Sequence, residues 1–342
     1  MRATLQFIII LLASLSFFTT VAYANCLTFD ENKRLSNYCL LNEVDGKLMD
    51  GQTASFVVQR LKTEGYFGGI SNPAWATNIA PSITYSNNVN GGNPNKKLIL
   101  GNLKFDSDPN LVAKQGVVGN LNLAAVNNVT YGEGRYLTSS LWGQIFYSPE
   151  HKLSYTNASA SLCSKNKLVA DLHVDICGYT SFQKKKLNED RASKLSLTFN
   201  RLSQLERFGY VEWSLGTIRS IQNDYEQNQI KLSIDLIHKD DWFTSFAIRT
   251  GEAVPNQLAL DFGIDMQFSN IFFGKKITVN FVHERQTGGK IFGVPRTDKI
   301  TSASFILPIA NDLTASLGYH KTDSNIDYFD QVYPSFSLTH SW

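Results

Sequence analysis

The sequence predicts an all-β protein, a transmembrane antiparallel up-and-down β-barrel of about 14 strands that follows a short N-terminal periplasmic segment. Many segments of about 9 to 11 residues alternate between apolar and polar side chains, which is long enough to cross a bilayer at a tilt. Only 18% of the residues are charged, whereas 12% are aromatic, as a lipid-facing surface requires.

The last stretch, 332–342, alternates in the same way and ends on Trp342. In outer-membrane barrels such a terminal aromatic lies in the periplasmic girdle and marks the chain for membrane insertion. A buried edge strand of a secreted sandwich is the alternative.

Residues 1–24 have the features of a secretory signal peptide. Arg2 precedes an apolar run that ends in the small-x-small sequence Ala-Tyr-Ala at 22–24. We therefore expect export to the outer membrane of a Gram-negative cell. No later window approaches the roughly 18 consecutive apolar residues of a membrane helix. The net charge of +2 is scattered along the chain, so nucleic acid is not an expected partner.

Residues 25–73 form the expected N-terminal segment, and the barrel is expected over 74–342. Within the segment, 53–61 could be an amphipathic helix, and we expect one helix at most. Cys26 and Cys39 flank a short polar stretch and could close a disulfide loop. Glycines at 65, 68 and 69 then lead into the first strand.

The predicted connections alternate between short inner turns and mostly long outer loops, which is the asymmetry of outer-membrane barrels. An inner turn at 163–166 would place Cys163 and Cys177 too far apart for a disulfide, so they are free or the register differs. An outer loop is expected at 287–298, and 97–105 is either a further strand or a hairpin in the first loop. The predicted strands are 75–90, 116–131, 136–148, 151–162, 167–178, 194–203, 208–222, 229–238, 241–250, 257–269, 275–286, 299–309, 312–322 and 331–342.

Acidic residues and one histidine are the candidates for lining the lumen. The pattern Asp-x-His-x-Asp at 171–175 would place two carboxylates and an imidazole on one face of a strand. This spacing could hold a metal, but a hydrated lumen lining is the favoured interpretation. The sequence shows none of the motifs of serine hydrolases, zinc peptidases or phosphate-binding loops, so we expect no enzyme and no cofactor. The candidates are Asp171, His173, Asp175, Asp235, Asp261, Asp265 and Glu284.

Short motifs near both ends of the predicted barrel carry a family resemblance. Arg296-Thr297-Asp298 precedes a predicted strand, Ser324-Asn325-Ile326 falls in the last long loop, and 81–91 would be a first strand with an Asn-rich exit. Together with the strand number, they resemble the surface lipoprotein assembly modifier family over residues 75–342. The family motif residues are Arg296, Asp298, Ser324 and Asn325.

The resemblance implies an outer-membrane translocator of the type XI secretion kind, which moves a lipoprotein or a small secreted protein client to the cell surface. The sequence departs from the family in one respect. Its members usually carry a periplasmic domain of tetratricopeptide repeats, and a helix-pair repeat of about 34 residues cannot be stacked in the segment before the first strand.

Three functions therefore remain open: the translocator, a passive porin for small solutes, and a surface adhesion or receptor barrel. Outer-membrane lipid and the barrel-assembly machinery are expected partners in all three cases, and a protein client only in the first. The end motifs favour the translocator. A porin predicts conductance across a planar bilayer, whereas a translocator predicts a client that stays in the periplasm when the gene is deleted.

Overall fold

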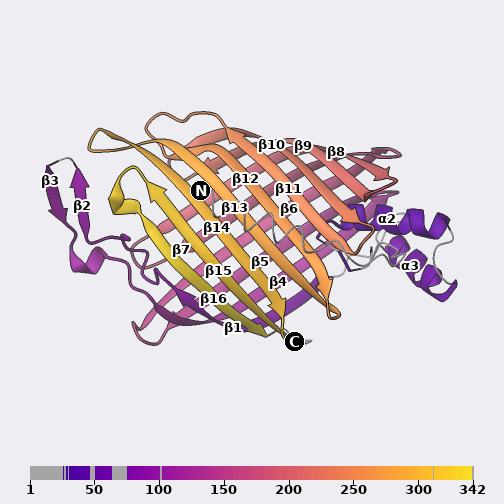
Figure 1. Cartoon of the computed structure of the whole chain (residues 1–342), viewed down its shortest axis with the longest axis horizontal. Helices are drawn as coiled ribbons and strands as arrows, with labels where there is room; N and C mark the ends of the chain where they lie inside the picture. Colours follow the sequence, from indigo (N-terminus) through magenta and orange to yellow (C-terminus); the bar gives the residue numbers. More distant parts are fainter. Residues whose placement is uncertain are drawn as a thin grey trace.

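The structure is a computed structural model that describes residues 26, 28, 29, 31–46, 51–63, 75–100, 102–310 and 312–340. The predicted signal peptide at 1–24 and the terminal Trp342 lie outside these residues. In the described part of the chain, fourteen strands form one closed antiparallel barrel (Figure 1). The sheet closes because β1 pairs with β4 on one side and with β16 on the other, which confirms the predicted fold class. The barrel strands are β1 (Trp75–Ser86), β4 (Gly116–Gly132), β5 (Arg135–Ser148), β6 (Leu153–Val169), β7 (Leu172–Lys184), β8 (Glu189–Leu205), β9 (Gly209–Gln222), β10 (Glu226–His238), β11 (Trp242–Gly251), β12 (Ala259–Phe272), β13 (Lys275–Ile291), β14 (Val294–Pro308), β15 (Leu313–Ser324) and β16 (Gln331–His340).

The strands have an apolar outer face and an inner face that is mostly polar. On β8, Leu195 and Leu197 point outward and are 58% and 40% exposed, whereas Asn200 and Leu202 point inward and are buried. Side chains of a strand alternate between the two faces because the repeat is two residues. Closure leaves no unpaired strand edge, and a bilayer requires this because it offers no water to pair with free backbone N–H and C=O groups. The chain is thus a transmembrane barrel of the outer-membrane type.

The two ends of the barrel differ in their connections. Short turns join the strands at the end where β1 begins and β16 stops. One of them consists of Phe273 and Gly274, which both have positive φ values of 50° and 73°. At the opposite end, β2 (Lys97–Leu100) and β3 (Leu103–Asp106) form a separate hairpin between β1 and β4. Residues 97–105 therefore add no barrel strand, and the short-turn end corresponds to the periplasmic side of such barrels.

Three predicted connections are wrong. The connection implied at 179–193 is much shorter, because β7 extends to Lys184 and β8 begins at Glu189. β6 runs through the predicted turn at 163–166 as far as Val169, and the turn falls at 170–171. Cys163 consequently lies directly opposite Cys177, and the two form a disulfide with a Cα–Cα distance of 4.1 Å. The expected loop at 287–298 is instead made of the paired ends of β13 and β14, joined by a turn of Phe292 and Gly293.

The segment before the barrel contains two helices, α2 (Lys33–Asp45) and α3 (Gly51–Thr63), so the expectation of one helix at most is wrong. Asn32 caps α2, because its side chain accepts a hydrogen bond from the Leu35 N–H at 3.1 Å. The buried face of α2 combines apolar residues with Arg34 and Glu43. Neither helix in the described residues is long and apolar enough to cross a membrane.

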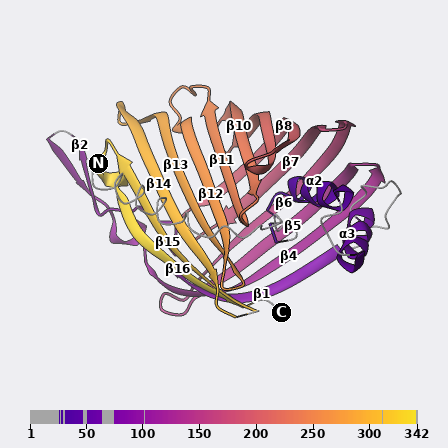
Figure 2. The same ribbon diagram turned by 45° about the vertical axis from the view of Figure 1, so that its right-hand side comes forward.

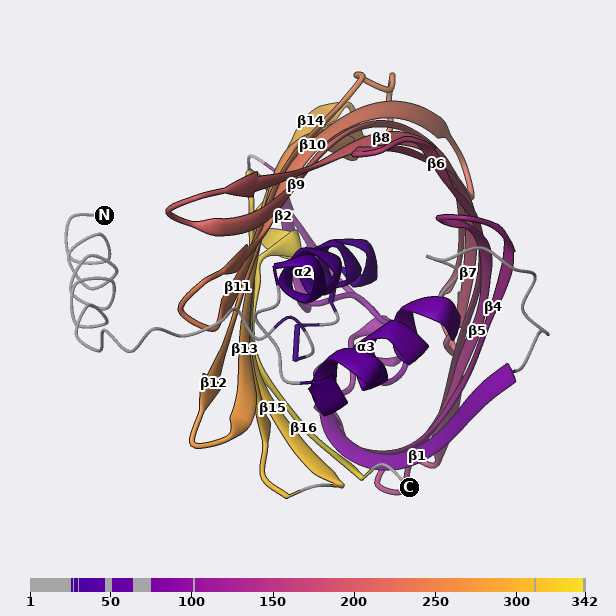
Figure 3. The ribbon, with the colours of Figure 1, turned by 90° about the vertical axis from the view of Figure 1, so that its right-hand side faces the viewer.

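Residues 26–63, as far as they are described, are called the plug segment below. Figures 2 and 3 show α2 and α3 at the short-turn end of the barrel, and in the view along the barrel both fall inside the outline of the ring of strands. Phe29 stacks on Phe243 of β11 with ring centroids 6.3 Å apart. Each large apolar side chain buried here stabilises docking by about 1.5–3 kcal/mol. The buried cluster consists of Cys26, Phe29, Leu35, Cys39, Leu40, Val57 and Leu61 of the plug segment with Leu202, Tyr210, Ile237 and Phe243 of the wall.

Candidate functional site

Arg34 joins the plug segment to the inner wall of the barrel. Its Nη1 donates to both carboxylate oxygens of Asp175 on β7, at 2.8 and 3.0 Å. Its Nε and Nη2 donate to the two oxygens of Glu212 on β9, at 3.0 and 2.6 Å. All three residues are buried, with 5%, 9% and 2% of their surface exposed. Two-point hydrogen bonds from a guanidinium to carboxylates fix both distance and orientation, so this contact sets where α2 lies in the mouth.

Further polar contacts surround Arg34 and fasten the plug segment to other strands. Asn32 donates to Asp235 on β10 at 2.7 Å. Glu31 pairs with Lys276 of β13 at 3.3 Å and accepts a hydrogen bond from Ser269 of β12 at 3.0 Å. Together with Arg34, these contacts attach the plug segment to five strands.

Two ionisable groups of α2 are shifted by this environment. Burial lowers the pKa of Arg34, but the hydrogen bonds and negative charges of Glu212 and Asp175 outweigh burial and raise the pKa above its ordinary value. Arg34 is therefore always charged. Burial and the nearby charge of Asp241 raise the pKa of Glu43 to about 7. Glu43 therefore takes up a proton near neutral pH, and its neutral form suits the buried site.

The predicted triplet on one strand is only partly present. His173 and Asp175 point into the lumen from β7, whereas Asp171 lies in the preceding turn, where its carbonyl accepts from the Leu202 N–H at 2.8 Å. The Nδ1 atom of His173 is buried and has no hydrogen-bond partner among the described residues. Both oxygens of Asp175 are bound by Arg34. The three residues thus do not converge on a shared metal position.

A second charged cluster lies on the inner wall of β11, β12 and β13. Arg249 donates to Asp265 at 2.8 and 2.9 Å and to Glu284 at 2.8 Å. Asp261 falls in a bulge of β12, and its carboxylate pairs with Arg285 instead of joining this cluster. The cluster carries one positive and two negative charges, so it gives this side of the lumen a local negative excess.

The opposite wall, formed by β1, β4, β5 and β16, is neutral and hydrophilic. It encloses a hollow of about 590 Å³. Side chains here bond to groups on the neighbouring strand: Ser82 donates to the Asn120 side chain at 2.6 Å, and Asn122 donates to the backbone carbonyl of Ala80 at 2.9 Å. Amides and hydroxyls without charge suit hydrated neutral solutes. The lining includes Asn78, Ser82, Thr84, Asn120, Asn122, Gln144, Ser337 and Thr339.

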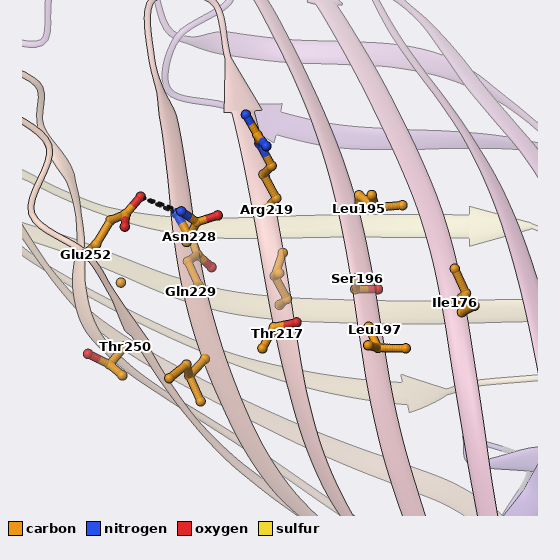
Figure 4. Close-up of a pocket in the computed structure, with 13 residues that line it drawn as sticks. Ile176, Leu195, Ser196, Leu197, Thr217, Arg219, Asn228, Gln229, Thr250 and Glu252 are labelled. Carbon is orange, nitrogen blue, oxygen red and sulfur yellow. Dashed lines mark hydrogen bonds between the residues drawn. The ribbon is translucent and has the colours of Figure 1, made fainter.

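Another hollow, of about 710 Å³, lies on the outer surface of the barrel across β7 to β11 (Figure 4). Leu195 and Leu197 border it on one side and Ile230 on the other, all pointing away from the lumen. Thr217 of β9 lies between them and is shorter, which leaves the depression. Because it faces lipid, this hollow is no part of a path for solutes.

The four motif residues of the family resemblance meet at the long-loop end. Arg296 donates to Asp298 at 3.0 Å, and Ser324 Oγ donates to the same carboxylate at 2.7 Å. Asn325 accepts from the Thr297 N–H at 2.7 Å and donates to the Pro295 carbonyl at 2.8 Å. These contacts hold the loop after β15 against β14, so the structure places the motif residues in loop packing.

Two of the residues that dominate the mouth, Arg34 and Glu212, were not among the sequence candidates, whereas Asp175 was. Arg34 and Glu212 lie 178 positions apart, and neither belongs to a recognisable motif. The one available signal was the pair Cys26 and Cys39, because their disulfide, with a Cα–Cα distance of 5.8 Å, lies inside the plug segment. A disulfide-closed loop ahead of a barrel indicates an ordered element rather than a linker.

No family model and no curated protein matches the chain. The resemblance to the assembly-modifier family therefore stays a prediction. Solved structures with a similar chain course include OccK2 (OpdF) of Pseudomonas aeruginosa, which is 5% identical, with 79% of this chain and 97% of that chain covered and a TM-score of 0.42. OprB of Pseudomonas putida is 7% identical over 83% and 96% of the two chains, with a TM-score of 0.44. OccAB2 of Acinetobacter baumannii is 9% identical over 82% and 99%, with a TM-score of 0.40.

Proposed function

We propose that this protein is an outer-membrane channel for small hydrophilic solutes, and that the plug segment narrows its periplasmic mouth. The observation that carries the proposal is the polar interior of a closed apolar cylinder. A neutral hydrophilic wall on β1, β4, β5 and β16 faces the charged cluster around Arg249, with a hollow of about 590 Å³ beside the former. Such an interior stabilises water and polar solutes inside the bilayer.

The plug segment supports a regulated channel more than an open one. It is attached through a small number of strong polar contacts centred on Arg34, together with one apolar cluster. A plug held in this way has two discrete states, docked and undocked, because the guanidinium cannot keep half of its bonds without leaving buried charge unpaired.

Conductance of the purified barrel in planar bilayers tests the proposal. We expect discrete current steps whose size or frequency increases when the plug segment is undocked. In a second assay, unmodified barrels inserted into liposomes should let small neutral solutes enter. A barrel that never conducts, with the plug segment docked or undocked, would contradict it.

The translocator function expected from the family resemblance makes a different prediction. It requires that a lipoprotein or secreted protein disappears from the cell surface when the gene is deleted, with no need for ionic conductance. Surface proteomics with and without the gene, run beside the bilayer recordings, separates the two functions.

A further inference from the structure

A separate cavity of about 300 Å³ lies between α2 and the inner wall formed by β4, β5 and β6. Lys33 and Asn37 line it from α2, Asn128 and Thr130 from β4, and Tyr136 and Lys165 from β5 and β6. The cavity adjoins the Arg34 site but shares no lining residue with it, and it does not include the neutral hollow described above.

Two ammonium groups line this cavity, and no described carboxylate pairs with either of them. Asp175 is opposite Lys165 in the strand register, but Arg34 occupies both of its oxygens. In the described part of the chain, neither Lys33 nor Lys165 forms an ion pair, and the contact of Lys165 is with the ring of Tyr136, 5.6 Å from the centroid.

The local charge is therefore unbalanced. Lys33, Arg34 and Lys165 supply three positive charges, and Asp175 and Glu212 supply two negative ones, which leaves an excess of one positive charge. These groups are close enough for the other four charges all to act on the Lys165 ammonium. Lys165 is half-buried on the inner wall, whereas Lys33 is exposed at the mouth of the cavity. The charge without a partner on Lys165 is therefore unfavourable, and an anion bound between the two ammonium groups removes the imbalance.

We propose that this cavity binds a small organic anion. Its oxyanion lies between the Lys33 and Lys165 ammonium groups, where Asn128 and Thr130 supply further hydrogen bonds. Its apolar body lies against the Tyr136 ring and Val126, which also lines the cavity. A carboxylate and a phosphate monoester share this chemistry, because lysine recognises both as point charges.

The site has a structural consequence beyond conduction. Lys33 belongs to the plug segment and Lys165 to the barrel wall, so the anion bridges the two and stabilises the docked state. Binding itself does not depend on whether the barrel conducts.

Isothermal titration calorimetry of the full-length barrel in detergent tests the proposal with three probes of similar size: phenylacetate, phenyl phosphate and uncharged phenylacetamide. We expect heat of binding from at least one of the two anions and none from the amide. Which anion binds identifies the oxyanion class. Lys33→Gln and Lys165→Gln should each weaken binding by about tenfold or more, whereas Lys165→Arg, which keeps the charge, should retain it.

Lys231→Gln is the matched control, because Lys231 also points inward but lies on β10, outside the cavity. Its binding should be unchanged. Heat-modifiable migration on gels checks that each variant forms a barrel. Because Lys33 is an exposed helix residue, the Lys33→Gln variant should fold, and it still tests the proposal if a change at Lys165 prevents folding.

The proposal is overturned if neither anion binds, if phenylacetamide binds as well as the anions, or if the Lys33 and Lys165 variants bind as tightly as the Lys231 variant. Conductance of the same preparation, measured without phenylacetate or phenyl phosphate, separates a missing anion site from a failure of the channel function. A conducting barrel that binds neither anion contradicts the anion site alone.

Discussion

Replacing Arg34 by alanine should release the plug segment. The substitution leaves Asp175 and Glu212, which are 9% and 2% exposed, without their cation in the docked state. Removing one partner of a buried ion pair costs about 3–5 kcal/mol. Undocking lets water reach both carboxylates, so this cost falls on the docked state alone. At about 1.4 kcal/mol per factor of ten, a cost of this size should raise the ratio of undocked to docked channels by about a hundredfold to several thousandfold.

Single-channel recording measures this ratio directly. We expect Arg34→Ala to show more frequent or longer openings at unchanged membrane potential. Arg219→Ala is the matched control, because Arg219 pairs with Glu226 at the other end of the barrel and both side chains are more than half exposed. Exposed pairs contribute little, so this variant should behave like the unmodified protein.

A compensated variant separates the loss of the ion pairs from general damage. Arg34→Met combined with Asp175→Asn and Glu212→Gln removes all three charges and keeps similar volumes, so docking should return towards the unmodified level. If Arg34→Ala and the unmodified protein open equally often, the Arg34 contact does not hold the mouth closed. If the triple variant opens as often as Arg34→Ala, unpaired charge is not the reason for release.

Three further changes should have distinct effects. The folded-state pKa of Glu43 is raised to about 7. Docking should therefore be strongest below the unfolded pKa of about 4.5, and it should weaken by up to about 3 kcal/mol as the pH rises through 7. Chemical denaturation followed from pH 5 to 8 checks this, and Glu43→Gln should flatten the pH profile of stability. Reduction of the Cys26–Cys39 disulfide removes about 3 kcal/mol of loop constraint, so limited proteolysis should cut the plug segment faster with reductant. Arg249→Ala leaves two lumen carboxylates unpaired, and the reversal potential in a salt gradient should shift towards cation selectivity; an unchanged potential would place that cluster outside the ion path.

The alternation of apolar and polar residues was sufficient to predict the barrel but not every turn. The stretch at 163–166, Cys-Ser-Lys-Asn, is polar and resembles a turn, whereas the real turn at 170–171 lacks glycine, proline and asparagine. A bulge between Lys167 and Val169 also interrupts the two-residue repeat there. At 287–298 the glycines and proline suggested a loop, yet they lie in paired strand ends around a turn of Phe292 and Gly293.

The functional site was harder to predict than the fold. Inward-facing Asp175 and Asp235 could be expected from strand periodicity, but their partners on the plug segment could not. α2 carries Arg34, Asn37 and Glu43 on its buried face, so its sequence lacks the apolar stripe that identifies a helix packed on a core. Its partners are polar side chains of the lumen, and only the folded barrel brings them together.

The disulfide between Cys163 and Cys177 bears on how the barrel is assembled. The two residues are direct cross-strand neighbours, so their bond can form only when β6 and β7 are aligned as in the finished wall. A slip of one residue would turn every lumen-facing group of this ribbon towards lipid. In an oxidising periplasm, the disulfide can form before the barrel inserts into the bilayer, and it then fixes the register of β6 and β7. This hairpin enters the membrane with its strand pairing already set.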